Sequence, residues 1–135
     1  MKKIAVVTGG GSGIGQSAAL ELQKTGFNVY IVGRREEELL KTVKLSENSD
    51  VNIIPFPADI TNSSEVNSLF QKIKNDFGRV DILFNNAGMG APRVPIEDLK
   101  EEDWRKAVDV NLTGSFLCAQ QAVKLMKEQN PMGGR

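Results

Sequence analysis

The glycine-rich stretch at residues 8–15, Thr-Gly-Gly-Gly-Ser-Gly-Ile-Gly, limits most strongly what this chain can fold into. A short apolar run at residues 4–7 precedes it, and apolar residues at helical spacing follow it through residues 16–25. A strand, a glycine turn and a helix in this order predict a phosphate cradle. Glycines let the backbone approach a pyrophosphate, and the free amides of the first helical turn face the anion. A turn that only links strand to helix is the simpler alternative, but this context favours nucleotide binding.

Strand-like and helix-like segments alternate along the whole chain. Strands are expected at residues 3–8, 28–32, 51–56 and 81–84, and helices at residues 16–25, 36–45, 62–77 and 101–129. Alternation of this kind predicts an α/β fold, a doubly wound parallel sheet of Rossmann type with strand order 3-2-1-4. Pro55 favours an edge position for the third strand. Residues 8–15 and 85–88 should then meet at the crevice between the first and fourth strands, where such sheets bind ligands.

Four motifs in this order resemble those of the classical short-chain dehydrogenase/reductase family. They are the glycine motif with Thr8, the pair Asp59-Ile60, the element Asn85-Asn86-Ala87-Gly88, and Asn111 within Val110-Asn111-Leu112-Thr113-Gly114. The resemblance implies hydride transfer between a nicotinamide cofactor and a small carbonyl or alcohol substrate. It implies that Asn111 is catalytic, and that the cofactor contacts are Thr8, Gly9, Gly11, Ser12, Gly13, Ile14, Gly15, Arg34, Arg35, Asp59, Ile60, Asn86, Ala87 and Gly88.

Several of these residues have simpler explanations that the sequence leaves open. Asp59 fits a loop acid after the third strand, although adenine contact is favoured because that strand ends near the crevice. Asn86 fits a turn residue that bonds to the backbone. Asn111 fits an exposed helix face about as well as it fits catalysis, and Gly114 in the same helix predicts a close packing contact.

The end of the second strand favours NADP(H) over NAD(H). A fold of this type usually grips the ribose 2′-hydroxyl with an acid there, whereas this chain has Arg34 and Arg35. Guanidinium groups bind a 2′-phosphate through paired hydrogen bonds, and Arg34 is the stronger candidate. Solvated loop charges are the alternative. Some NADP-binding members carry a further basic residue where this chain has Ser12.

The chemistry that the resemblance implies needs a serine and a Tyr-x-x-x-Lys motif that these residues do not provide. Tyr30 is the only tyrosine, it falls in the second strand, and Arg34 stands four residues later. We therefore expect residues 1–135 to be the cofactor-binding half of a longer enzyme, inactive alone, with the outer edge of its fourth strand unpaired. The alternative is a nucleotide-binding or sensing module without chemistry; a purely structural dimerisation piece ranks last.

The composition excludes several other classes of function. Basic and acidic residues number 17 each, so no nucleic-acid partner is implied, and no apolar run approaches the roughly 20 residues of a membrane span. Histidine is absent and no metal site is expected. Cys118, the single cysteine, cannot form an internal disulfide, which fits an inert thiol in a cytoplasmic protein.

The last predicted helix carries an apolar face that we expect to be buried against the sheet. Its members are Trp104, Val108, Leu112, Phe116, Ala119 and Val123. The family resemblance implies that this helix also packs in a homodimer or homotetramer.

Overall fold

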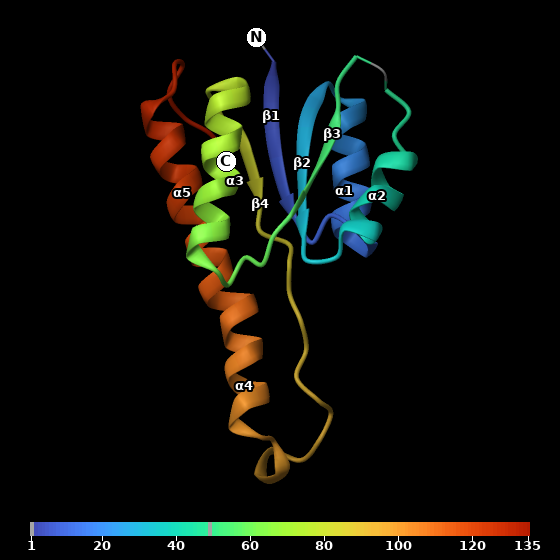
Figure 1. The fold of residues 1–135 in the computed structure, drawn as a ribbon, viewed down its shortest axis with the longest axis vertical. Coiled ribbons are helices and arrows are strands. Elements are labelled where there is room, and N and C mark those ends of the chain that lie inside the picture. Colours follow the sequence, from blue (N-terminus) through green and yellow to red (C-terminus); the bar gives the residue numbers. More distant parts are fainter. Residues whose placement is uncertain (1, 49) are drawn as a thin grey trace.

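The computed structural model describes residues 2–48 and 50–135, which form one parallel sheet with helices on both faces (Figure 1). The strands are β1 (Lys3–Thr8), β2 (Phe27–Gly33), β3 (Ile53–Pro57) and β4 (Ile82–Phe84). The helices are α1 (Gly13–Lys24), α2 (Glu36–Lys44), α3 (Ser63–Phe77), α4 (Glu101–Val108) and α5 (Ser115–Glu128), with a 3₁₀ turn at Ile96–Asp98 and a π-helical segment at Asp109–Gly114. The sheet order β3-β2-β1-β4 confirms the predicted topology. Among the residues described, no helix is long and apolar enough to cross a membrane.

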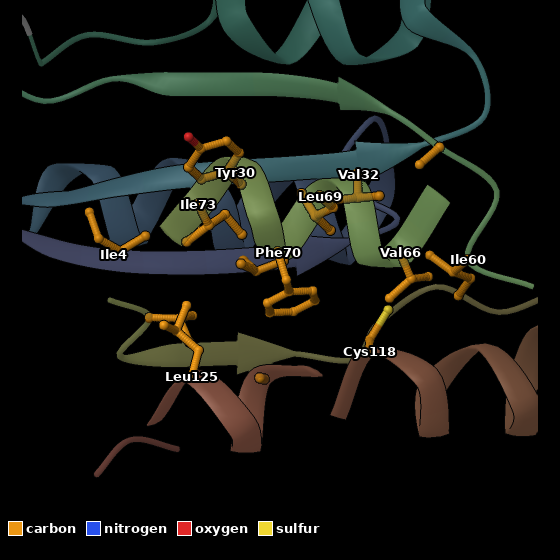
Figure 2. Packing of buried hydrophobic residues seen from close by; sticks show 14 residues of the cluster. Ile4, Tyr30, Val32, Ile60, Val66, Leu69, Phe70, Ile73, Cys118 and Leu125 are labelled. Carbon is orange, nitrogen blue, oxygen red and sulfur yellow. The ribbon is translucent and has the colours of Figure 1, made fainter. Parts of the chain in front are cut away.

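Alternating residues of β1 supply two separate apolar cores, one on each face of the sheet. Ile4 and Val6 face α3 and α5, and Figure 2 shows Ile4 in that core with Leu69 of α3 and Leu125 of α5. Ala5 and Val7 belong to the opposite core, beneath α1 and α2. A strand covered on both sides must be apolar throughout, which explains the unbroken run at residues 4–7.

The parallel register brings the carboxyl ends of the strands to one edge. Thr8 pairs with Val32 and Val7 with Phe84, so the turns that follow β1, β2 and β4 leave the sheet side by side. β3 is an outer strand of the sheet, as Pro55 predicted. This edge holds the segments that the sequence assigns to ligand binding.

The long helix predicted over residues 101–129 is present as a continuous helical run from Glu101 to Glu128, but the expectation that its predicted apolar face is buried is wrong. The π-helical segment separates α4 from α5, and α4 extends beyond the carboxyl edge of the sheet (Figure 1). The sheet therefore cannot cover it, and the side chains of Trp104 and Leu112 remain 58% and 67% exposed. Phe116 and Val123 are exposed as well. The extra residue per π turn shifts the helical phase, and α5 instead buries Cys118, Ala122 and Leu125.

The π-helical segment contains the close contact predicted at Gly114. A Cβ atom placed there would lie 2.7 Å from Cδ1 of Ile60. The glycine therefore lets the helix approach the loop after β3.

The sequence led us to expect that the outer edge of β4 is unpaired, but the structure shows that part of this edge is paired. The amide of Arg135 donates to the carbonyl of Asp81 (2.9 Å), and the amide of Leu83 donates to the carbonyl of Arg135 (2.7 Å). These are the bonds of a parallel ladder with Arg135 opposite Ile82.

A largely buried ion pair fixes the chain where it enters β4. The guanidinium of Arg79 contacts the carboxylate of Asp81 at 2.5 Å, and the same carboxylate accepts the amide of Ile4 at 2.8 Å. Burial on its own raises the pKa of Asp81, but the hydrogen bonds from Arg79 and Ile4 hold that pKa below its ordinary value. A depressed pKa means that the ionised group contributes stability above the unfolded-state pKa and loses it as the pH falls through the folded-state pKa.

We therefore expect Asp81→Asn to lower the free energy of unfolding by about 2 kcal/mol at pH 7. The difference from wild type should shrink as the pH falls below about 4, where the unfolded chain takes up the proton, and should vanish below the depressed pKa of the folded-state carboxylate. Urea unfolding between pH 7 and pH 3 measures it, with the exposed Asp98→Asn as the control. A difference that does not change with pH would contradict this assignment.

Candidate cofactor-binding site

A cleft of about 200 Å³ opens at the carboxyl edge of the sheet. It brings together nine of the residues that the sequence predicts as cofactor contacts: Gly9, Gly11, Ser12, Arg34, Arg35, Asp59, Ile60, Ala87 and Gly88. These residues come from the turns after all four strands. Residues as far apart in the sequence as Gly9 and Gly88 therefore line the same cleft.

The remaining predicted residues lie next to the cleft and do not line it. They are Thr8, Gly13, Ile14, Gly15, Asn86 and Asn111. The Thr8 side chain is 1% exposed, whereas Ile14 is 74% exposed on the first turn of α1. The contacts described below show what each of these residues does in the framework of the cleft.

The glycine turn presents a row of free backbone amides. The amides of Gly9 and Gly10 both donate to the carbonyl of Val32, at 2.8 and 3.4 Å, and this fixes the turn on the end of β2. Within the described chain, no acceptor lies against the amides of residues 11–15. Free amides at the start of a helix form an anion site, reinforced by the helix dipole.

Gly15 allows the turn and α1 to approach each other. A Cβ atom at this position would overlap the carbonyl oxygen of Gly9 and lie 2.5 Å from Nδ2 of Asn86. The buried Gly15 therefore sets the position of the helix N-terminus relative to the turn.

Thr8 and Asn86 connect the ends of β1 and β4. The Thr8 hydroxyl accepts the amides of Asn86 (3.0 Å) and Ala87 (2.9 Å) and donates to the carbonyl of Phe84 (3.4 Å). In return, Nδ2 of Asn86 donates to the carbonyl of Thr8 at 3.1 Å. The Thr8 side chain thus positions the opposite wall of the cleft.

Asn111 holds the loop that follows β4. Its Oδ1 accepts the amide of Met89 (2.9 Å), and its Nδ2 donates to the carbonyl of the same residue (2.7 Å). Gly88 makes room for this clamp, because a Cβ atom there would lie 2.8 Å from Oδ1 of Asn111. Both ends of the Asn111 amide are therefore engaged in fixing Met89, which lines the cleft.

Charged groups gather at the end of the cleft beside β2. Arg34 and Arg35 are exposed and lead into α2, and the pKa of Asp59, which lines the same cleft, is below its ordinary value. The main causes are hydrogen bonds from the hydroxyl and amide of Thr61, with a smaller effect from Arg34. Asp59 therefore both closes its own loop and remains ionised at the cleft.

The sequence profile of the family described as short chain dehydrogenase matches residues 3–134. The chain belongs to the short-chain dehydrogenase family. The 3beta-hydroxysteroid dehydrogenase of Mediterraneibacter gnavus is 36% identical over 133 residues, which cover 98% of this chain and 47% of that protein. The chain spans about half the length of the curated relatives it matches.

Solved structures of this short-chain dehydrogenase family share the fold. NAD+-bound xylitol dehydrogenase superposes with a TM-score of 0.90 at 30% identity, covering 97% of this chain and 50% of that one. A metagenomic short-chain oxidoreductase in complex with NADP superposes with a TM-score of 0.89 at 27% identity, covering 97% and 59%. Both nicotinamide cofactors therefore occur in complexes of proteins similar to this chain.

Sequence reasoning missed six residues that line the cleft. They are Val32, Gly33, Glu38, Leu39, Ala58 and Val110. Most are apolar residues at element ends, which a pattern assigns to the core. Glu38 could have been found, because its spacing from the buried Leu39 and Thr42 places it at the edge of the inward face of α2.

Cys118 has a structural role, as the sequence indicated. It is fully buried among core residues, beside Val66 and Ile60 in Figure 2, and burial raises the pKa of its thiol to about 11. Among the residues that the structure describes, no cluster of three or more histidine, cysteine, aspartate or glutamate side chains could hold a metal.

Proposed function

We propose that this chain is the cofactor-binding part of an NADP(H)-dependent oxidoreductase that transfers a hydride between the nicotinamide and a small carbonyl or alcohol substrate. One observation carries the proposal: the free amides of residues 11–15 at the rim of the cleft. They have the geometry of an anion site but no acceptor in the described protein.

The residues present fit a dinucleotide. The amides of the glycine turn would bind its diphosphate. Gly9 and Gly11 let this turn pack closely on the neighbouring elements, since Cβ atoms there would lie 2.9 Å from Nδ2 of Asn86 and 3.0 Å from Cβ of Glu38. Asp59 and Ile60 would contact the adenine. Ala87 and Gly88, on the other wall, would border the nicotinamide end, and Asn111 would act through Met89 by fixing that wall. When bound, the cofactor supplies or accepts the hydride.

The preference for NADP(H) rests on Arg34 and Arg35. Both line the cleft, and neither side chain forms an ion pair or hydrogen bond with any part of the described protein. They would be available for a 2′-phosphate, which guanidinium groups bind in a paired geometry.

The complete enzyme in this proposal has about twice this length, since relatives extend well beyond the matched region. A serine and a Tyr-x-x-x-Lys motif in the additional part would orient the substrate and transfer the proton. The exposed apolar side chains of Trp104, Leu112 and Phe116 support a homodimer or homotetramer, since exposed apolar patches of this kind favour association. We place the enzyme in the cytoplasm.

A nucleotide-binding or sensing module without chemistry is the second candidate. It is favoured by the absence of those catalytic residues from residues 1–135. The coding sequence past Arg135 distinguishes the two, because a strand with serine followed by Tyr-x-x-x-Lys supports only the enzyme.

Titration with NADPH and NADH tests the proposal directly. We expect the purified protein to bind NADPH more tightly than NADH, and the 135-residue chain alone to show no NADPH-dependent carbonyl reduction. Absence of binding by either dinucleotide would overturn the oxidoreductase proposal, and turnover by the 135-residue chain would overturn the proposed division of the enzyme.

A further inference from the structure

The charged side chains that line the cleft sum to zero, so the lining has no excess positive charge for a phosphate. Arg34 and Arg35 contribute two positive charges, and Glu38 and Asp59 contribute two negative ones. A 2′-phosphate adds up to two more negative charges at neutral pH. A cluster with no net charge would bind it poorly unless one carboxylate were compensated.

Lys41 compensates one of those carboxylates from outside the cleft. Its Nζ lies 2.8 Å from Oε1 of Glu38, one helical turn earlier on α2. Lys41 is not part of the lining, and its side chain is 64% exposed, whereas the Glu38 side chain is 25% exposed. The lysine thus approaches Glu38 from the solvent side.

Glu38 is fixed where its charge matters. The glycine turn packs directly on it, since a Cβ atom at Gly11 would lie 3.0 Å from Cβ of Glu38. Arg35 lies within electrostatic range, and the hydrogen bond from Lys41 is the main reason that the pKa of Glu38 is below its ordinary value. The ionised carboxylate therefore lies within electrostatic range of Arg35, and its negative charge opposes the binding of an anion there.

We propose that Lys41 is a specificity-determining residue for the cofactor's 2′-phosphate, acting through Glu38. By neutralising Glu38, the lysine leaves Arg34 and Arg35 available to a phosphate, and the cluster gains one net positive charge. A 2′-hydroxyl carries no charge, so its binding does not depend on this compensation. The inference rests on the proposed function and names a determinant within that site.

The test is a set of variants with two ligands that differ only in the phosphate. Lys41→Gln should raise the Kd for NADPH about three- to fivefold and change the Kd for NADH by less than twofold, in keeping with the strength of a partly exposed ion pair. Lys44→Gln is the matched control, because it removes the same charge from the same exposed helix without a partner in the cleft. The effect of Lys41→Gln should weaken as salt is raised.

Glu38→Gln separates a charge effect from a structural one. In the Glu38→Gln background, Lys41→Gln should change the Kd for NADPH and the Kd for NADH by the same factor, because no carboxylate remains to be neutralised. 2′,5′-ADP and 5′-ADP give a second readout that is independent of the nicotinamide end. Thermal unfolding of each variant checks that the fold is retained.

The outcomes distinguish this inference from the proposed function. If wild type prefers NADPH but Lys41→Gln and Lys44→Gln behave alike, the role of Lys41 is wrong and the proposed cofactor stands. If wild type prefers NADH, the cofactor preference is wrong, and the ratio of the two Kd values in Lys41→Gln against Lys44→Gln still decides the role of Lys41. Absence of binding by either dinucleotide overturns both.

Discussion

Arg34→Asp should raise the Kd for NADPH about 30- to 100-fold and leave the Kd for NADH within about threefold, because it removes a charge-assisted hydrogen bond and adds repulsion. Arg34 lines the cleft at the end of β2 and has no ion-pair partner among the described residues. The variant therefore breaks no contact that holds the fold. Fluorescence titration or calorimetry with both dinucleotides measures the effect.

Lys106→Asp is the control for the change in net charge. Lys106 is exposed on α4 and does not line the cleft. It should leave both Kd values within twofold of wild type. If Arg34→Asp weakens the two dinucleotides equally, the arginine does not read the 2′-phosphate, and our cofactor assignment fails.

Gly15→Ala should cost about 3 kcal/mol of folding free energy and abolish measurable dinucleotide binding. The added methyl group meets the carbonyl of Gly9 and Nδ2 of Asn86, and both belong to the framework of the cleft. Relief requires α1 to move away from the glycine turn, which disperses the free amides. Urea unfolding and NADPH titration measure the two effects.

Ser17→Ala, on the exposed side of the same helix, is the matched control for Gly15→Ala. It should be neutral or slightly stabilising, because alanine is the better helix former. If Gly15→Ala retains wild-type stability and binding, the close approach of turn and helix is not what shapes the anion site.

Patterns with a local physical cause were predictable from the sequence. The alternation of elements fixed the sheet order, and Pro55 indicated the edge strand because proline cannot donate to a ladder. The start of α3 also follows a local rule, because asparagine is a favoured N-cap residue and the side chain of Asn62 accepts the amides of Ser64 and Glu65. The Glu65 side chain accepts the amide of Asp59.

Features that depend on three-dimensional packing were not predictable. Apolar spacing assigned Trp104 and Leu112 to the core, because a pattern cannot show that α4 passes the end of the sheet or that a π turn shifts its phase. The clamp between Asn111 and Met89 joins residues 22 positions apart, and no local rule links them. Most of the cleft could be predicted, but the task of each residue required the hydrogen bonds.

The hydroxyl of Thr8 has a consequence for how this site can change. It accepts two amides from the segment after β4 while its own strand leads into the glycine turn, so neither flank of the cleft can shift alone. A substitution on one flank should therefore alter the structure of the other flank. The effects of substitutions at Thr8 and Asn86 on the free energy of unfolding should be strongly non-additive. Evolutionary retuning of substrate choice would then occur in the loops farther out, with this joint kept intact.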